Sequence, residues 1–134
     1  MKFISTQKFI RMSPEKLRRV ADVAREMSPE EAIEKLPFTK KKAATPLVKV
    51  IATALANAKL KGVSENLLID EIQINEGPRL KRGRPVSRGR WHPIKRRMSH
   101  IRVVLTTKTE VLNTKSETNS RVQNKKIKTR KKNV

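Results

Sequence analysis

The sequence predicts an α+β fold, in which a three-stranded, mostly antiparallel sheet is packed on one face by three helices and carries a long protruding basic β-hairpin. The first observation is the order of the expected elements, which runs strand, helix, helix, long helix, strand, arm, strand. The second is the arm itself, because residues 77–109 contain eleven Lys and Arg side chains and no acid. The third is that strand-like runs bracket the arm, so that its two ends are held together.

The formal net charge of +21 is separated from the parts of the chain that are able to form a core. Residues 1–76 carry a net charge of +4, residues 77–109 carry +11 and residues 110–134 carry +6. The expected partner is therefore a polyanion, and nucleic acid fits because each neutralised phosphate releases counterions. Aromatic residues make up only 3% of the chain, so we expect a small, aliphatic core.

Residues 2–12 are predicted to form the first strand, because two Phe-Ile pairs are separated by polar residues. This pattern leaves open which face of the strand points inward. Ser13 and Pro14 then predict the start of a helix of about three turns, with Ser13 capping free amides and Pro14 at the first helical position. The apolar residues that follow at helical spacing form its buried face.

A second, short helix is predicted to begin after Ser28, where the sequence Ser-Pro-Glu-Glu matches a capping box. Its inward side chains are Ala32, Ile33 and Leu36, and Pro37 limits its length.

Residues 39–61 contain the longest periodic stretch, which predicts the core helix. Its apolar stripe consists of Ala44, Leu47, Val48, Ile51, Ala54, Leu55 and Ala58. Pro46 leaves two alternatives for the start: either Thr45 caps the helix, or the helix begins near Thr39 and bends at Pro46. Gly62 is expected to close the helix as a left-handed cap.

Residues 67–75 alternate between apolar and polar side chains, which predicts a half-buried strand. Its inward side chains are Leu68, Ile72 and Ile74, and Asp70 falls on the same side as a misfit. Gly77-Pro78 bends or interrupts this strand. After the arm the chain returns as a third strand, whose inward side chains are Ile101, Val103 and Leu105.

The extended hairpin covers residues 78–100 and turns at residues 87–90. With ten residues on each side, it reaches roughly 30 Å beyond the sheet. Trp91, the only Trp of the chain, lies beside the expected tip. It either stacks on a nucleobase, as in single-stranded RNA recognition, or packs against Pro85 or Pro93 of the arm itself.

We expect one globular domain at residues 1–107, which includes the hairpin, and a basic tail at residues 108–134 that is disordered by itself. The absence of Cys excludes a disulfide framework, a thiolate nucleophile and a Cys-based metal site. Neither a signal peptide nor a membrane-spanning run is recognisable, so the protein is expected to stay in the compartment where it is made.

No catalytic pattern is found, so we predict a protein that is not an enzyme and uses no cofactor or metal. His92 and His100 lie in or beside the arm without a neighbouring carboxylate, which favours phosphate contact or a structural role. The acids of residues 26–34 are explained by helix first turns and solvated faces. A free DNA-binding protein is the first alternative, and a membrane-active protein is weaker because the arm lacks an amphipathic apolar face.

In combination, these segments resemble one family, the large-ribosomal-subunit protein twenty-two family of bacteria and organelles. The matching pieces are SPEKLRRVADV with Ser13, Lys16 and Arg18, TKKKAA followed by ALANA in the long helix, Glu76-Gly77-Pro78 before the arm, and Ser99-His100-Ile101 after it. They span residues 3 to 107 in the expected order.

The resemblance implies a structural rRNA-binding protein whose domain sits near the outer opening of the peptide exit tunnel and whose hairpin lines the tunnel wall, near large-subunit protein four. It implies a supporting role in subunit assembly, with large-subunit rRNA, neighbouring ribosomal proteins and, at the tip, the nascent peptide as partners. No membrane or second copy of the chain is expected. The location would be a cytoplasmic ribosome, with an organellar one as the alternative. The rRNA-binding residues would be Lys16, Arg18, Arg79, Lys81, Arg82, Arg84, Arg88, Arg90, Trp91, His92, Lys95, Arg96 and Arg97.

Overall fold

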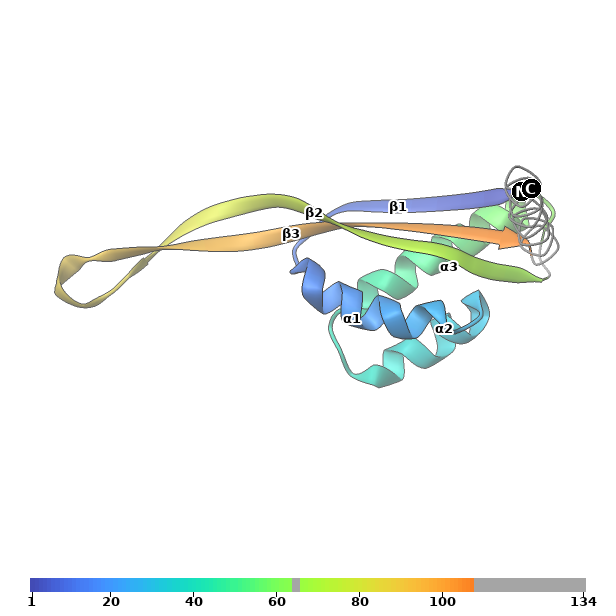
Figure 1. The fold of residues 1–134 in the computed structure, drawn as a ribbon, viewed down its shortest axis with the longest axis horizontal. Helices are drawn as coiled ribbons and strands as arrows, with labels where there is room; N and C mark the ends of the chain where they lie inside the picture. Colours follow the sequence, from blue (N-terminus) through green and yellow to red (C-terminus); the bar gives the residue numbers. More distant parts are fainter. Residues whose placement is uncertain (64–65, 108–134) are drawn as a thin grey trace, which may run out of the picture.

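The computed structural model describes residues 1–63 and 66–107, which form a three-stranded sheet covered on one face by helices (Figure 1). The elements are β1 (Lys2–Ile10), α1 (Pro14–Arg25), α2 (Pro29–Lys35), the 3₁₀ helix η1 (Leu36–Thr39), α3 (Ala44–Leu60), β2 (Leu67–Pro85), the 3₁₀ turn η2 (Ser87–Gly89) and β3 (Trp91–Thr107). The strand order is β1-β3-β2, with both pairings antiparallel. The predicted α+β fold is confirmed, whereas the predicted tail at residues 108–134 lies outside the described residues.

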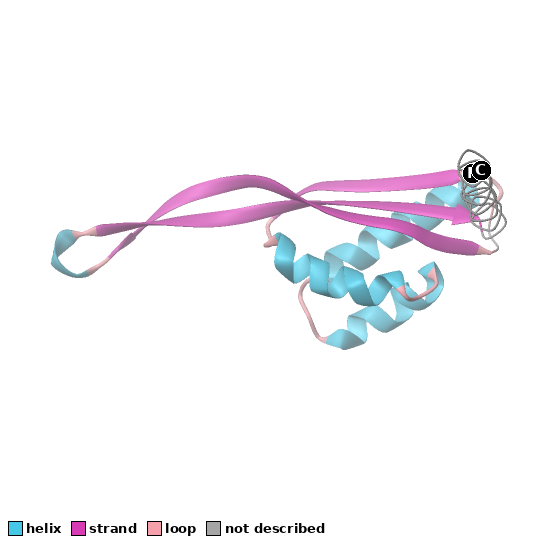
Figure 2. Ribbon diagram, viewed as in Figure 1, coloured by secondary structure: helices cyan, strands magenta, loops and turns pink. Residues whose placement is uncertain are grey.

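The helices lie against one face of the sheet (Figure 2). The core between them is almost entirely aliphatic. Leu17 of α1 and Ile51 of α3 are fully buried, as are Ile101 and Leu105 of the central strand β3. Full burial of such a side chain contributes about 1.5–3 kcal/mol. Phe3 is 2% exposed, which settles the face of β1 that the sequence pattern left open.

The two short helices differ in how they begin. Ser13 occupies the N-cap of α1 as predicted, but its side chain accepts no capping hydrogen bond, so the expected capping by Ser13 is wrong. Ser28 forms the predicted capping box at α2, in which the Glu31 N–H donates to Ser28 Oγ at 3.3 Å and the Ser28 N–H donates to Glu31 Oε2 at 3.4 Å. The Ser28 amide and then the positive charge of Lys35 hold the pKa of Glu31 below its ordinary value.

Neither predicted start of the long helix is correct, because α3 begins at Ala44 after an N-cap at Ala43. Lys40 adopts a left-handed conformation (φ 52°), which separates η1 from α3. Pro46 is therefore the third residue of α3, within the first turn, where amides have no acceptor inside the helix and the missing N–H costs nothing. No bend needs to be invoked at this proline.

The end of α3 follows the prediction. Gly62 has a positive φ of 76°, its N–H donates to the Lys59 carbonyl at 2.9 Å, and the Val63 N–H donates to the Ala58 carbonyl at 3.1 Å. These two bonds form a Schellman motif, in which the left-handed residue satisfies carbonyls of the last turn.

A β-bulge in β2 corrects the predicted inward face of that strand. The register against β3 shifts between Ile69 and Glu71, which leaves Asp70 as an extra residue. Before the bulge Leu67 is buried and Ile69 packs against the core, whereas Leu68, which we expected inward, is absent from the core cluster. Beyond the bulge, the two inward isoleucines are buried as predicted.

Two further bulges flank β3 where the domain ends and the arm begins. In β1, residues 8–9 lie opposite one residue of β3, and in β2 the predicted irregularity at residues 77–78 does the same. We call residues 8–9, 77–78 and 98–100 the joint. Ser99 anchors it, because this fully buried side chain donates from Oγ to the Met12 carbonyl at 2.6 Å. Bulges bend strands, so the joint sets the direction of the arm.

The arm continues the β2–β3 ladder without a further shift from Arg79 opposite Arg97 to Pro85 opposite Trp91. The tip closes where predicted, with the Val86 N–H donating to the Arg90 carbonyl at 2.8 Å. In Figure 1 the arm extends past the helices, and its tip lies at the opposite end of the molecule from the N-terminus.

Candidate nucleic-acid interface

A cleft of about 1010 Å³ lies between the base of the arm and the N-terminal ends of α1 and α3. We call it the basic cleft. It is lined by Arg11, Met12, Ser13, Lys16, Arg19, Lys41, Lys42, Ala43, Leu80, Lys95, Arg96, Arg97 and Met98.

Eight of these thirteen lining residues are Lys or Arg, and none is an acid. Within the described residues none of the eight forms an ion pair, although Arg97 lies close enough to Glu76 to help lower its pKa. Unpaired cations that converge on one concave surface repel one another and raise the local positive potential. The arrangement is therefore suited to a polyanion with several phosphates within reach.

Two helix N-termini add to this potential. The residues before α1 and α3, Ser13 and Ala43, both line the cleft, and neither N-cap makes a side-chain hydrogen bond. The first amides of a helix carry a partial positive charge, which favours an anion near them. No side chain of the cap accepts from the first amides of α1. This is consistent with a site in which a bound anion is their acceptor.

The structure brings four of the predicted site residues together in this cleft: Lys16 of α1 meets Lys95, Arg96 and Arg97 of the arm. Sequence reasoning missed Arg11, Arg19, Lys41 and Lys42. A signal was present, because Lys41 and Lys42 belong to a basic run directly before an apolar helix, and Lys16 and Arg19 share a helix face at a spacing of three.

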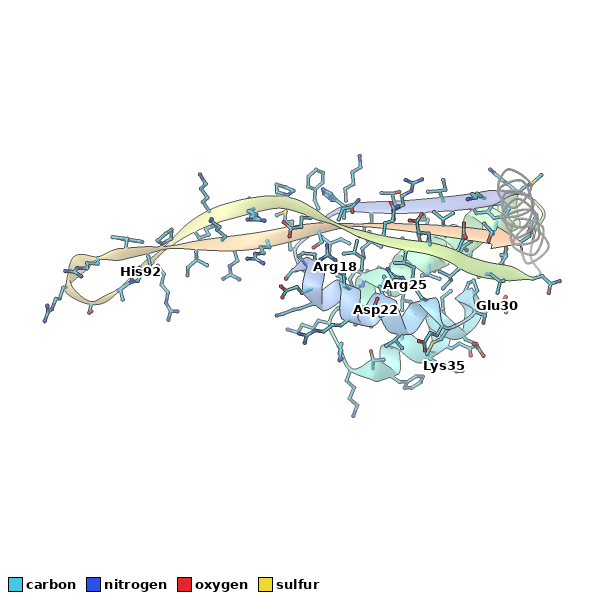
Figure 3. The ribbon with its side chains drawn as sticks, viewed as in Figure 1. Arg18, Asp22, Arg25, Glu30, Lys35 and His92 are labelled. Carbon is cyan, nitrogen blue, oxygen red and sulfur yellow. The ribbon has the colours of Figure 1, made fainter. Side chains whose placement is uncertain are left out.

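The other basic residues predicted for the arm are distributed along it, with side chains exposed to solvent (Figure 3). These residues are Arg79, Lys81, Arg82, Arg84, Arg88, Arg90 and His92. Arg79 is partly engaged, because its Nη2 lies 2.6 Å from Glu76 Oε2 and this hydrogen bond lowers the pKa of Glu76. Arg82 donates from Nη1 to the Lys81 carbonyl at 2.8 Å.

Arg18 lies outside the basic cleft and contacts the sheet instead. Its Nη2 donates to the Ile74 carbonyl at 3.3 Å, and Arg25, two turns further along α1, donates to the Ile72 carbonyl at 2.8 Å (Figure 3). Because β2 is an edge strand, its outward carbonyls have no donor from a neighbouring strand. These two guanidinium groups donate to them instead. The rRNA contact predicted for Arg18 stays a prediction, and its role in this structure is to hold α1 on the sheet.

Trp91 lies over the opposite strand of the arm. A Cβ placed on Gly83 would come within 2.8 Å of Trp91 Cε3, so the indole rests against the glycine backbone diagonally across the ladder. The side chain is nevertheless 67% exposed. The contact at Gly83, a residue that neither predicted alternative named, holds the ring while leaving most of it accessible.

His100 has a structural role at the joint. Its Nδ1 accepts a hydrogen bond from the Phe9 N–H at 3.0 Å, and the two rings meet edge to face with centroids 5.0 Å apart. Among residues 1–63 and 66–107, no group of three or more His, Asp and Glu side chains is placed to hold a metal ion. In the same residues, no helix is long and apolar enough to span a membrane.

Comparison with known proteins gives a consistent result. The family model described as ribosomal protein L22p/L17e matches residues 5–106. Large ribosomal subunit protein uL22 of Desulfotalea psychrophila is 50% identical over 100 residues, covering 73% of this chain and 91% of the relative. The uL22 protein of Desulforamulus reducens is 45% identical over 105 residues, covering 77% and 93%.

The uL22 protein of Thermotoga sp. strain RQ2 is 48% identical over 100 residues, which cover 73% of this chain and 63% of the longer relative. The matched residues include β1 from residue 5 onward, the helices, the joint and the whole arm. The chain described here belongs to the ribosomal protein L22p/L17e family.

Proposed function

We propose that this protein is a structural, non-catalytic constituent of the large ribosomal subunit that binds large-subunit rRNA through the basic cleft and the arm. Membership of the family supports the ribosomal role, and the convergence of eight cations and two helix N-termini supports the RNA contact. The basic cleft is the observation that carries the proposal. So much unpaired positive charge on one surface does not stabilise an isolated domain, but it does attract a polyanion.

The mechanism follows from the charges and the shape. Lys and Arg side chains in the cleft and along the arm neutralise phosphates, and these contacts fix the register of the protein on the RNA. Specificity then comes mainly from how the angle between arm and domain fits the folded RNA, since phosphate contacts carry no base code. The ordering of the arm is coupled to this binding, and phosphate neutralisation offsets its cost.

The shape also supports the finer part of the proposal. A two-stranded arm with exposed cations on both strands is able to enter RNA as a narrow rod and line the peptide exit tunnel, with its tip near the nascent peptide. The domain then remains outside, beside neighbouring ribosomal proteins of a cytoplasmic ribosome, and the arm supports subunit assembly.

The cleft is tested by neutralising two of its lysines. In the variant Lys16→Gln/Lys42→Gln, affinity for protein-free large-subunit rRNA should fall. The slope of log affinity against log salt should become less steep by about 1.5, because each lost phosphate contact removes about 0.7–0.9. Titrations at several salt concentrations with the full chain measure both quantities.

The matched control is Lys2→Gln/Lys59→Gln, which removes the same charge from the first residue of β1 and the last turn of α3, outside the basic cleft. Its slope should stay close to that of the unmodified protein. Equal loss in both variants would contradict a localised site. Equal affinity for duplex DNA and rRNA at the same salt would favour a free DNA-binding protein instead.

A further inference from the structure

Phe9 combines an unusual backbone conformation with an exposed aromatic ring. Its φ is +58°, a left-handed value that bulky side chains rarely adopt, and the residue is 59% exposed. The chain has four aromatic residues, and only Phe3 is buried, because Phe38 and Trp91 are exposed as well. Backbone strain of this kind persists where surrounding contacts enforce it, and it is frequent at functional positions.

The contacts that enforce this conformation come from His100. The imidazole accepts the Phe9 N–H and meets the phenyl ring edge to face at an interplanar angle of 87°. The backbone at Gly77 approaches the imidazole so closely that a Cβ there would lie 3.2 Å from it. These contacts hold Phe9 against His100 at the bulge.

The ring lies on the face of the sheet that the helices leave open. Ser99 and Ile101 are fully buried on the helix side, so His100 between them points to the other face, and Phe9 contacts His100 there. Neither ring lines the basic cleft. This surface is thus separate from the interface described above, although both meet at the joint.

The surroundings of the ring are cationic and contain little exposed apolar surface. Lys8 precedes Phe9, and Arg102 follows His100 on the same face; both are exposed, and within the described residues neither forms an ion pair. Along β1 the next exposed large apolar side chain is Ile4, about 17 Å away in an extended strand. Phe9 is therefore not part of a large exposed apolar patch of the kind that marks a protein-binding site, whereas a single ring between cations suits a base flanked by phosphates.

We propose that Phe9 is a stacking platform for an unpaired base of large-subunit rRNA, with Lys8 and Arg102 contacting the adjoining phosphates. The inference rests on the proposed function, since it takes rRNA as the partner, and it adds a base-contacting site outside the cleft and the arm. In an ordinary extended strand the Phe9 ring would lie along the sheet. The strained left-handed conformation is then the consequence of presenting the ring to the RNA instead.

The first test compares Phe9→Leu with the unmodified full chain in binding to protein-free large-subunit rRNA. Leucine keeps the apolar bulk but removes the aromatic face, so affinity should fall roughly 5- to 100-fold, the usual range for loss of one base stack. The slope of log affinity against log salt should not change, because no phosphate contact is lost. Phe9→Trp should retain binding.

Phe38→Leu is the matched control, because Phe38 is 82% exposed on η1, away from the joint, and should leave affinity unchanged. Thermal unfolding checks that each variant is folded. If the unmodified chain binds rRNA and Phe9→Leu binds equally well, the stacking inference is wrong while the proposed function stands. If the unmodified chain does not bind rRNA, the proposed function fails first.

A second measurement identifies the partner of the ring directly. A photoreactive benzophenone side chain placed at position 9 and incorporated into large subunits should form cross-links to rRNA. Cross-links to a ribosomal protein alone would overturn the inference and assign the surface to a protein neighbour.

Discussion

At the scale of single residues, the adjacent Arg18 and Arg19 of α1 have different roles, because consecutive residues of a helix point about 100° apart. Arg19 shares a face with Lys16 and lines the basic cleft, whereas Arg18 and Arg25 share another face and donate to carbonyls of the edge strand β2. Sequence reasoning selected Arg18 and missed Arg19, because the position of the β2 edge is decided by strand pairing far along the chain.

This division of roles predicts that substitution by Ala affects stability at Arg25 and rRNA binding at Arg19. Arg25→Ala should lower the free energy of unfolding by about 1 kcal/mol, because a half-exposed hydrogen bond to the Ile72 carbonyl is lost, and should change rRNA affinity little. Arg19→Ala should leave stability unchanged and weaken rRNA binding. Denaturant unfolding and rRNA titration of both variants check this, and a stability loss in Arg19→Ala would show that the two faces are misassigned.

At the scale of elements, most features determined by neighbouring residues were predictable, although the Ser13 cap and the start of α3 were not, and features determined by strand pairing were missed. The capping box of Ser28 and Glu31, the left-handed Gly62 and the tip turn all depend on local sequence, and all three are found. The bulge at Asp70 depends on how β2 aligns with β3, so an alternation pattern misassigned Leu68. The cleft escaped prediction for the same reason, because its lining residues come from four separate segments of the chain.

The capping box makes the stability of the fold depend on pH in a known direction. The pKa of Glu31 is lower in the folded chain than in the unfolded one, so its ionised form stabilises the fold at pH values above about 4.3. This contribution is lost as the pH falls through the lowered folded value. In Glu31→Gln, which keeps a capping acceptor but does not titrate, unfolding midpoints should depend less on pH between about 5 and 3. Identical pH profiles for both proteins would contradict this assignment.

At the scale of the whole molecule, the domain and the arm are built from the same two strands but differ in burial and in charge. The domain half of β2 and β3 is buried under helices, while the arm half has neither a core nor acids beyond its base. Charge separation along the sequence was enough to predict this division, since +11 of the net charge lies in residues 77–109. Stability should therefore reside in the domain, and RNA contact in the arm and cleft.

A shortened arm tests this division. Lys81 and Lys95 lie opposite each other in the ladder, so residues 82–94 are replaceable by Asn-Gly, which closes a two-residue hairpin turn. The circular-dichroism melt should remain close to that of the intact protein, because no core side chain is removed. Incorporation into large subunits, measured by co-sedimentation in competition with the intact protein, should fall. Loss of the melt would show that the arm begins further out than the joint.

The β2–β3 ladder runs without a register shift from Arg79 to the tip, and this has a consequence for the gene. The buried halves of β2 and β3 cannot slip, so they fix which face every arm residue presents, over the full distance from the joint to the tip. One codon inserted into either side of the arm would exchange the two faces of that strand from the insertion to the turn. Two codons inserted into each strand at facing positions, or a change confined to residues 86–90, would leave the faces intact. Variation in arm length should therefore occur in steps of two residues per strand or at the tip.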